Sequence, residues 1–324
     1  MKIADAIRTG EAIPIPLSGL LLAATPLTRI GMFLRSLKPV TRVDAHVISI
    51  GNLTAGGTGK TPAVIRYARE HIAAGKKVGI LTRGYGTAST EKLVVSADIE
   101  PAEHCAKLGD EPAVILRHCP EAIIFKSKNR VHAAQIAVDE YQCDVLILDD
   151  GYQYLPLHRD ENILLIDACN PFGNGHLLPR GFLREPVAAM TRATRILVTR
   201  CDQSDQLDLI RGAIRKIHPD CPVEWTQHAP TALVNLATGE KLPLDHFEGQ
   251  DVVAACAIGN PEAFHQTLSN LGMNVTELIT APDHAPLPES ALTHDPTIIT
   301  EKDAVRLTVP TPNLYSLTIE LHDH

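Results

Sequence analysis

A short apolar stretch that leads directly into a glycine-rich turn is the feature that most constrains the fold of this chain. Residues 47–50 have the apolar, β-branched character of a buried strand, and the turn after them ends in Gly59-Lys60-Thr61. Apolar residues then recur at helical spacing, at Ala63, Val64, Tyr67, Ala68 and Ile72. The succession predicts a strand, a phosphate-binding loop and a helix.

The chemistry of phosphate binding explains why these residue types occur together. Glycines let several backbone N–H groups turn toward one anion, and the helix N-terminus adds partial positive charge. We expect Lys60 to reach the β- and γ-phosphates of a nucleotide and Thr61 to place its hydroxyl on Mg²⁺. The predicted nucleotide-binding residues are Thr54, Ala55, Gly56, Gly57, Thr58, Gly59, Lys60 and Thr61.

The loop departs from two known patterns. The common phosphate loop has glycine where this chain has Thr54. The variant loop of partition-type ATPases has a lysine where this chain has Ala55. A glycine-rich surface turn with an exposed lysine is the structural alternative, and the strand and helix on either side argue against it.

Composition sets further limits. A chain of 324 residues fits one large or two medium domains, and 44% apolar content is ordinary for a globular protein. Only 4% of residues are aromatic and the net charge is -8, so we expect no nucleic-acid partner. The seven cysteines form no C-x-x-C pair, which indicates reduced thiols in a cytosolic protein rather than disulfides or a zinc site.

Residues 1–42 differ from the rest of the chain. They contain six basic and two acidic residues around apolar runs that are too short and too often interrupted by proline to span a bilayer. Two interpretations stay open: a helix packed on the core, or an amphipathic segment at the surface of an anionic membrane. We reject a cleaved signal peptide, because an exported nucleotide-binding loop would find no ATP.

The rest of the chain alternates strand-like and helix-like stretches. We predict strands at residues 77–82, 93–95, 122–125 and 144–148 and helices at 113–117 and 131–140; in the second half, strands at 163–166, 195–199, 223–226, 252–257 and 297–299 and helices at 204–217 and 261–271. This rhythm predicts an α/β fold, a P-loop NTPase-like α/β/α sandwich with a second, smaller α/β domain. We place the first domain at 43–155 and the second at 156–324.

One predicted strand carries acidic residues at its end. Asp149 and Asp150 follow the run at 145–148, and parallel α/β sheets bind ligands at the carboxyl ends of their strands. We therefore predict that Thr61, Asp149 and Asp150 hold Mg²⁺. A charged strand end without a metal is the structural alternative.

Motifs spread over most of the chain resemble the tetraacyldisaccharide 4′-kinase family, the lipid A 4′-kinases of Gram-negative bacteria. They are Gly51-Asn52-Leu53-Thr54 with Gly56-Gly57-Thr58-Gly59-Lys60-Thr61-Pro62, Arg83-Gly84-Tyr85-Gly86, Gly109-Asp110-Glu111-Pro112, Leu148-Asp149-Asp150-Gly151-Tyr152-Gln153, Leu183-Arg184-Glu185-Pro186, Ile258-Gly259-Asn260-Pro261, Pro282-Asp283-His284 and Thr300-Glu301-Lys302-Asp303. The chain departs from the family pattern at Tyr152, Tyr154, Arg180, Phe182 and Ala285.

The resemblance implies a function. Such a protein uses ATP and Mg²⁺ to phosphorylate the 4′-hydroxyl of tetraacyldisaccharide 1-phosphate, giving lipid IVA for lipid A and lipopolysaccharide. Its partners are then an acylated disaccharide phosphate and a membrane, with no obligate protein partner indicated. The implied location is peripheral, on the cytoplasmic side of the inner membrane, where residues 1–42 would meet the bilayer.

Catalytic roles follow in part from the resemblance. Besides Lys60, we expect Asp110 to act as general base, and capping of the helix after Pro112 is the alternative from sequence. The resemblance implies that His284 partners Asp110 in a dyad across the cleft between domains. We expect Arg83, Tyr85, Arg130 and Arg184 to bind substrate, since arginine suits bidentate phosphate contact. Residues 300–303 fit a helix cap.

Two other functions stay possible at this point. One is a partition-type regulatory ATPase that cycles on a membrane without a lipid acceptor, against which the residue Ala55 counts. The other is a P-loop kinase acting on a soluble metabolite. A requirement for the lipid acceptor would separate both from a lipid kinase.

Overall fold

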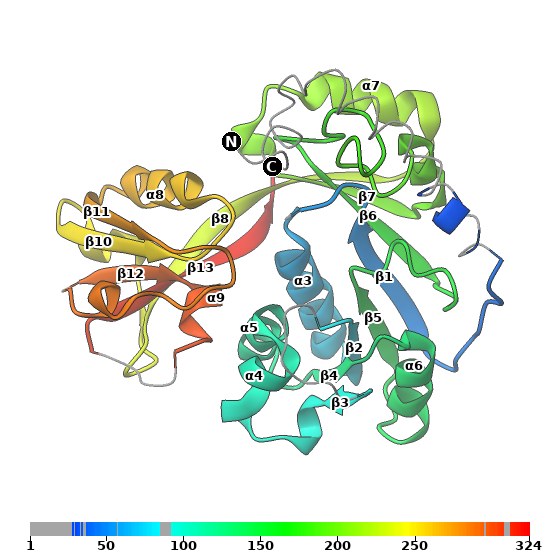
Figure 1. The fold of residues 1–324 in the computed structure, drawn as a ribbon, viewed down its shortest axis with the longest axis horizontal. Helices are drawn as coiled ribbons and strands as arrows, with labels where there is room; N and C mark the ends of the chain where they lie inside the picture. The colour runs from blue at the N-terminus through cyan, green and yellow to red at the C-terminus, as the bar shows by residue number, and fades with distance from the viewer. Residues whose placement is uncertain are drawn as a thin grey trace. The chain divides into compact units, whose positions relative to one another are not determined.

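The computed structural model describes residues 28, 30–32, 34, 37–56, 58–84, 92–294, 296–307 and 312–324 (Figure 1). Their contacts divide the chain into two compact units. The phosphate-loop unit comprises the chain up to Arg83, Asn129–Gln227 and His322–His324. The Asp110 unit comprises Gly84–Lys128 and His228–Leu321.

A parallel sheet forms the centre of the phosphate-loop unit. Its strand order is β8-β7-β6-β1-β5-β2, with every pair parallel. The strands are β1 (His46–Asn52), β2 (Val78–Thr82), β5 (Val145–Asp149), β6 (Glu161–Asp167), β7 (Arg195–Thr199) and β8 (Val223–Asn235). All residues of β2 and β5 are buried, as expected for parallel strands covered on both faces.

Helices cover this sheet. They are α3 (Lys60–Ala73), α6 (Arg130–Asp139) and α7 (Leu207–Ile217). In Figure 1, α3 and α6 lie on opposite sides of the strands β1, β5 and β2. On its apolar face α7 buries Ile210 and Ile214 in a core that also contains Leu164, Ile196 and Tyr152. The α/β/α layering predicted from sequence is confirmed.

The register of the central strands brings two predicted motifs to the same edge of the sheet. Ile50 near the end of β1 pairs with Asp149 at the end of β5. The phosphate loop leaves β1 two residues later, and Asp150 follows β5 directly. Because β1 and β5 are parallel, both strands end at the same edge of the sheet. The phosphate loop and Asp150 therefore lie near each other.

The Asp110 unit has its own parallel strands, in the order β11-β10-β12-β13. They are β10 (Asp251–Cys256), β11 (Asn274–Thr280), β12 (Thr297–Thr300) and β13 (Leu314–Asp323); β8 pairs antiparallel with β9 (Lys241–Leu242), and β3 (Val94–Val95) with β4 (Ile123–Lys126). The helices are α4 (His104–Leu108), α5 (Asp110–His118), α8 (Pro261–Asn270) and α9 (Glu301–Ala304).

Six short 3₁₀ turns complete the described elements of the two units. They are η1 (Ser96–Asp98), η2 (Pro101–Glu103), η3 (Val187–Arg192), η4 (Cys201–Gln203), η5 (Leu244–Phe247) and η6 (Glu289–Leu292).

The units divide the chain differently from the contiguous domains we predicted. Residues 84–128 group with the second unit, because α5 packs on α9. The predicted strands and helices are present, but β9, β11, β13 and α4 were not predicted. β11 is an edge strand with mostly exposed or half-buried side chains, so it lacks a clean apolar pattern. The seven cysteines are free thiols, as predicted.

Gly51 on β1 and Gly212 on α7 allow a matched stability test. A Cβ at Gly51 would lie 2.8 Å from the Tyr152 backbone nitrogen and 2.9 Å from its Cβ, whereas a Cβ at Gly212 meets nothing within 4 Å. We expect Gly51→Ala to destabilise the protein by about 1–3 kcal/mol through overpacking. Gly212→Ala should stabilise it by about 0.5–1 kcal/mol through helix propensity. Thermal unfolding checks both; equal shifts would contradict the packing argument.

Candidate active site

The phosphate loop has the backbone that its sequence predicts. Gly56 and Gly59 adopt positive φ values of 113° and 78°, conformations that other residues rarely adopt. The helix α3 begins at Lys60 with no side-chain cap and no acidic residue in its first turn. Its first N–H groups and its dipole therefore remain available to an anion. Gly57 lies outside the described residues.

Thr58 supplies an independent sign that the loop fits a phosphate. The residue is only 4% exposed, and its hydroxyl oxygen has no hydrogen-bond partner within the protein. Its backbone carbonyl is held in place by the Thr199 hydroxyl, which donates a hydrogen bond of 3.1 Å. A buried hydroxyl without a hydrogen-bond partner destabilises the fold. A phosphate oxygen at the loop would accept a hydrogen bond from the Thr58 hydroxyl.

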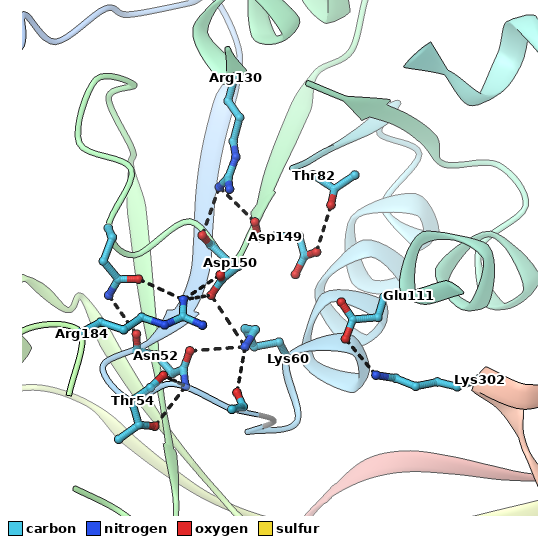
Figure 2. Close-up of polar contacts among 12 residues, drawn as sticks. Asn52, Thr54, Lys60, Thr82, Glu111, Arg130, Asp149, Asp150, Arg184 and Lys302 are labelled. Carbon is cyan, nitrogen blue, oxygen red and sulfur yellow. Dashed lines mark hydrogen bonds and ion pairs between the residues drawn. The ribbon is translucent and has the colours of Figure 1, made fainter. Parts of the chain in front are cut away.

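Lys60 points back over the loop rather than into solvent (Figure 2). Its Nζ donates to Asn52 Oδ1 and to the Gly56 carbonyl, both at 3.4 Å, and lies 3.7 Å from Asp150 Oδ1. Asn52 is fully buried and also donates to the Thr54 carbonyl at 2.8 Å. The ammonium group is thus positioned by the loop that it would serve.

Asp149 and Asp150 form the turn that ends β5 (Figure 2). Asp150 adopts a left-handed backbone with a φ of 50°, which aspartate tolerates better than most residues. Asp149 Oδ2 accepts a 3.4 Å hydrogen bond from the Thr82 hydroxyl. Burial alone would raise the pKa of Asp150, but the charges of Lys60 and Arg184 outweigh it and lower that pKa. Both groups suit a hard cation as carboxylates.

Arg184 joins this cluster from a distant loop. Its Nη1 donates to both carboxylate oxygens of Asp150, at 2.8 and 2.7 Å. The backbone beside it pairs with the phosphate loop: Arg184 N–H donates to the Leu53 carbonyl, and Ala55 N–H donates to the Phe182 carbonyl, both at 2.7 Å. The loop at 170–186 is therefore built onto the phosphate loop by backbone hydrogen bonds.

Arg130 does not have the environment of a substrate-binding arginine. It is only 5% exposed, and its Nη1 donates to the carbonyls of Asp149 and Asp150, both at 3.1 Å. The guanidinium lies 5.1 Å from the ring centre of Tyr154. Burial lowers the pKa of Arg130, although the charges of Asp149 and Asp150 act to raise it. The arrangement clamps the aspartate turn instead of leaving Arg130 available to a substrate.

The two remaining predicted substrate residues differ in what the structure shows. Arg83 follows β2 and is exposed. Tyr85 lies outside the described residues. Thr61, the predicted metal ligand, lies in the first turn of α3 and is half-buried.

In the Asp110 unit, Asp110 and His284 meet although 174 positions separate them. His284 Nδ1 lies 2.9 Å from Asp110 Oδ2, and His284 adopts a left-handed backbone with a φ of 65°. Non-glycine residues in that conformation are rare and concentrate at functional sites. The pair lies within one compact unit, not across a boundary between two domains as we had expected.

Asp110 is the first residue of α5, and the N-cap position belongs to Gly109. The alternative of a capping aspartate therefore does not describe it. Its Oδ1 accepts from the Glu111 backbone N–H at 3.0 Å, and its Oδ2 accepts from Arg306 Nη2 as well as facing His284. Burial would raise the pKa of Asp110, but Arg306, then Lys302 and His284, outweigh it and lower that pKa.

Residues 300–303 form the helix cap that the sequence predicts. The Thr300 side chain accepts from the Asp303 N–H at 3.3 Å, and α9 begins at Glu301. From α9, Lys302 Nζ reaches Glu111 at 2.9 Å (Figure 2), and Glu301 contacts His118 at 2.7 Å. One ion pair and one hydrogen bond thus attach α9 to α5, the helix that carries Asp110.

Several residues of these clusters were missed from sequence. Asn52 and Gln153 lie in quoted motifs but received no role, and Gln153 donates to the Asn52 carbonyl at 2.9 Å. Thr82 ends a predicted strand, so its position beside Asp149 follows only from the sheet order. Arg306 had no sequence signal, because nothing local distinguishes it from a surface arginine.

The N-terminal segment is described only in part, at residues 28, 30–32, 34 and 37–42. Four apolar side chains there are more than half exposed: Ile30, Leu34, Leu37 and Val40. Thr28 Oγ1 donates to the Leu178 carbonyl at 2.6 Å. Within the described part of the chain, no helix combines the length and apolar character needed to cross a bilayer. The remainder of the predicted membrane segment lies outside the described residues.

A parallel α/β sheet with a lysine-bearing glycine loop after its central strand, and paired aspartates at the end of the adjacent strand, defines a P-loop nucleotide-binding protein. The chain belongs to the tetraacyldisaccharide-1-P 4′-kinase family, LpxK, whose family model matches residues 11–323. The predicted family and its kinase activity class are thereby confirmed.

Individual relatives agree with this assignment. A tetraacyldisaccharide 4′-kinase of Anaeromyxobacter dehalogenans strain 2CP-C is 39% identical over 305 residues, covering 89% of this chain and 80% of the relative. One of Geobacter sulfurreducens is 38% identical over 322 residues, covering 96% and 88%. The crystal structure of LpxK from Aquifex aeolicus in complex with ATP matches with a TM-score of 0.76 at 27% identity, covering 95% of each chain.

Proposed function

We propose that this protein transfers the γ-phosphoryl group of ATP to the 4′-hydroxyl of a tetraacyldisaccharide 1-phosphate, giving lipid IVA in lipid A biosynthesis. The observation that carries the proposal is the phosphate-loop cluster of Lys60, Asp150 and Arg184 in a chain of this family. The relatives named above support a kinase over a partition-type ATPase without a lipid acceptor.

The phosphate-loop unit contains the groups that suit Mg-ATP. Backbone N–H groups of the loop and the Thr58 hydroxyl would hold phosphate oxygens, and Lys60 would neutralise charge on the β- and γ-phosphates. Thr61, Asp149 and Asp150 would hold Mg²⁺, which supplies charge neutralisation between the phosphates. Arg130 would keep the aspartate turn rigid through the two carbonyls it binds.

The Asp110 unit contains the groups that suit proton removal. A sugar hydroxyl is a poor nucleophile until its proton can be accepted during attack. Asp110, ionised at neutral pH and hydrogen-bonded to His284, is the proposed acceptor of that proton. His284 would orient the Asp110 carboxylate and share the proton that the carboxylate accepts. Arg83, Arg184 and Tyr85 are retained as candidates for contact with substrate phosphate or sugar.

The experiment that tests this function uses purified protein, Mg-ATP and the tetraacyldisaccharide 1-phosphate in detergent. We expect a doubly phosphorylated lipid, detected by mass spectrometry, and no product without the lipid. ATP hydrolysis that is independent of the lipid, with no lipid product, would instead favour the regulatory ATPase. Phosphorylation of a soluble sugar without detergent or lipid would favour a metabolite kinase.

We also propose that the protein binds the cytoplasmic face of the inner membrane peripherally, through its N-terminal segment. The supporting observations are the exposed Leu34 and Leu37, at 58% and 64%, within a basic segment of the sequence. Apolar side chains can enter the headgroup region while lysine and arginine meet anionic lipids. An acylated acceptor would be reached from that surface.

Replacing both Leu34 and Leu37 with aspartate should reduce binding to vesicles containing anionic phospholipid by about tenfold or more, because two apolar contacts are lost and two like charges are added. Co-sedimentation measures the effect. Leu209→Asp is the matched control, since Leu209 is 56% exposed on α7 and lies outside residues 1–42 of the sequence. Equal binding by the double variant and the control would refute the membrane role of this segment.

A further inference from the structure

Arg306 lies just after α9 and is more enclosed than a surface arginine. Its side chain is 15% exposed, and its guanidinium contacts four groups in the Asp110 unit. Nη1 donates to Asp303 Oδ1 at 3.1 Å and to the Ala285 carbonyl at 3.3 Å. Nη2 donates to Asp110 Oδ2 and lies 3.4 Å from His284 Nδ1.

These contacts attach Arg306 to both members of the Asp110–His284 pair. One end of the fork binds the Asp110 carboxylate on α5. The other binds the carbonyl of Ala285, the residue directly after His284. Asp303 anchors the guanidinium through its Oδ1, and it is itself only 2% exposed and held by Ala257 N–H and Thr300. The planar fork thus spans two elements that the chain brings together from distant positions.

We propose that Arg306 is a positioning residue for the phosphoryl-transfer reaction, holding the Asp110 carboxylate in place against His284. The inference rests on the proposed function of Asp110 as general base. A carboxylate that accepts a proton in the transition state must stay ionised and correctly oriented beforehand. A largely enclosed guanidinium supplies both conditions, because its Nη2 binds Asp110 Oδ2 while its Nη1 is held by Asp303 and Ala285. Asp110 keeps its second oxygen for the Glu111 N–H, so the carboxylate plane is fixed at both ends.

The neighbouring charged groups are consistent with this role. Asp110 is faced by Arg306 and by Lys302 and Asp303 of α9, by His284 and Asp283 of the loop at 281–286, by Glu111 of α5 and by Cys105 of α4. Lys302 is already paired with Glu111 at 2.9 Å. Of the side chains in this set, those of Arg306 and His284 contact the Asp110 carboxylate directly.

The test compares Arg306→Met, which keeps the side-chain length but loses charge and fork, with Arg306→Lys, which keeps the charge alone. We expect Arg306→Met to lower kcat about 10- to 100-fold at neutral pH, with a smaller change in KM for the lipid. Arg306→Lys should recover part of the loss. Because Arg306 is the largest of the charges that oppose the effect of burial, its removal should raise the pKa of Asp110, so the ratio of variant to wild-type kcat should fall as pH is lowered from 8 to 5.

Glu301→Gln is the matched control. It removes the charge of Glu301 and so weakens the contact between α9 and His118 of α5 without touching Asp110, and it therefore reports general loosening of α9. We expect a lower melting temperature for this variant but a constant activity ratio across pH. A loss in Arg306→Met that is the same at every pH, or that Glu301→Gln reproduces, would overturn the positioning role.

A second measurement does not depend on activity. In protein labelled at aspartate ¹³Cγ, the Asp110 resonance should titrate at higher pH in Arg306→Met than in the wild-type protein. If the wild-type protein transfers no phosphate to the lipid, the proposed function has failed. This titration then still tests whether Arg306 keeps the Asp110 carboxylate ionised. An unchanged Asp110 midpoint in Arg306→Met would refute the inference.

Discussion

Replacing Lys60 with methionine should lower kcat for lipid phosphorylation by about 10³-fold or more while leaving the fold intact. Phosphoryl transfer depends on charge neutralisation and positioning more than on covalent chemistry, so a missing cation at the β- and γ-phosphates is costly. Lys60 is positioned for this by Asn52 and the Gly56 carbonyl. Measurement of product by mass spectrometry at saturating ATP and lipid checks the result.

Lys76→Met provides the control for this variant. Lys76 is exposed just beyond the other end of α3 and should be replaceable without loss of activity. Thermal unfolding should show that Lys60→Met remains folded, since its ammonium group makes only long contacts with neutral oxygens and Asp150. A Lys60→Met protein that retains more than a tenth of wild-type kcat would remove Lys60 from the catalytic assignment.

The second large effect is expected at Asp110. Asp110→Asn should lower kcat about 10²- to 10⁴-fold, the range associated with loss of a general base, with little change in KM for ATP. His284→Gln should cost less, because it leaves the carboxylate in place. If Asp110 and His284 act together as a dyad, the Asp110→Asn/His284→Gln double variant should be about as slow as Asp110→Asn alone.

Two comparisons make this prediction discriminating. Glu103→Gln changes a carboxylate that pairs with Lys107 on the element before Asp110, and it should leave kcat unchanged. Multiplicative losses in the Asp110–His284 double variant would mean that the residues act independently, despite the 2.9 Å contact. Full activity of Asp110→Asn would assign proton removal to another group.

Local patterns were sufficient for most of the fold and for the phosphate-loop cluster. The strand β1, the glycine loop and α3 are contiguous, so one stretch of sequence was enough to predict all three. Asp149 and Asp150 could be placed because parallel strands end at one edge of a sheet. The roles of Arg130 and Arg184 could not be separated, because both follow apolar segments and only burial distinguishes the buried clamp Arg130 from the half-buried Arg184.

Long-range contacts set the limit of prediction for the Asp110 cluster. Arg306 and Asp110 are 196 positions apart, and His284 and Asp110 are 174 apart. No spacing rule links such positions, so the resemblance to a family identified His284 and nothing identified Arg306. The division into two units could not be predicted from the sequence either. Residues 84–128 join the Asp110 unit through contacts between α5 and α9, and these depend on side-chain pairs such as Lys302–Glu111.

The strand order has a consequence for how the chain is made. β1 pairs with β5 and β6, so this strand has no pairing partner until residues 145–149 have been synthesised. At a translation rate of about 5–20 residues per second, that interval is roughly 5–20 s. During this interval the apolar edge of β1 is open to pairing with other chains, so we expect the nascent protein to be more prone to aggregation than the completed fold.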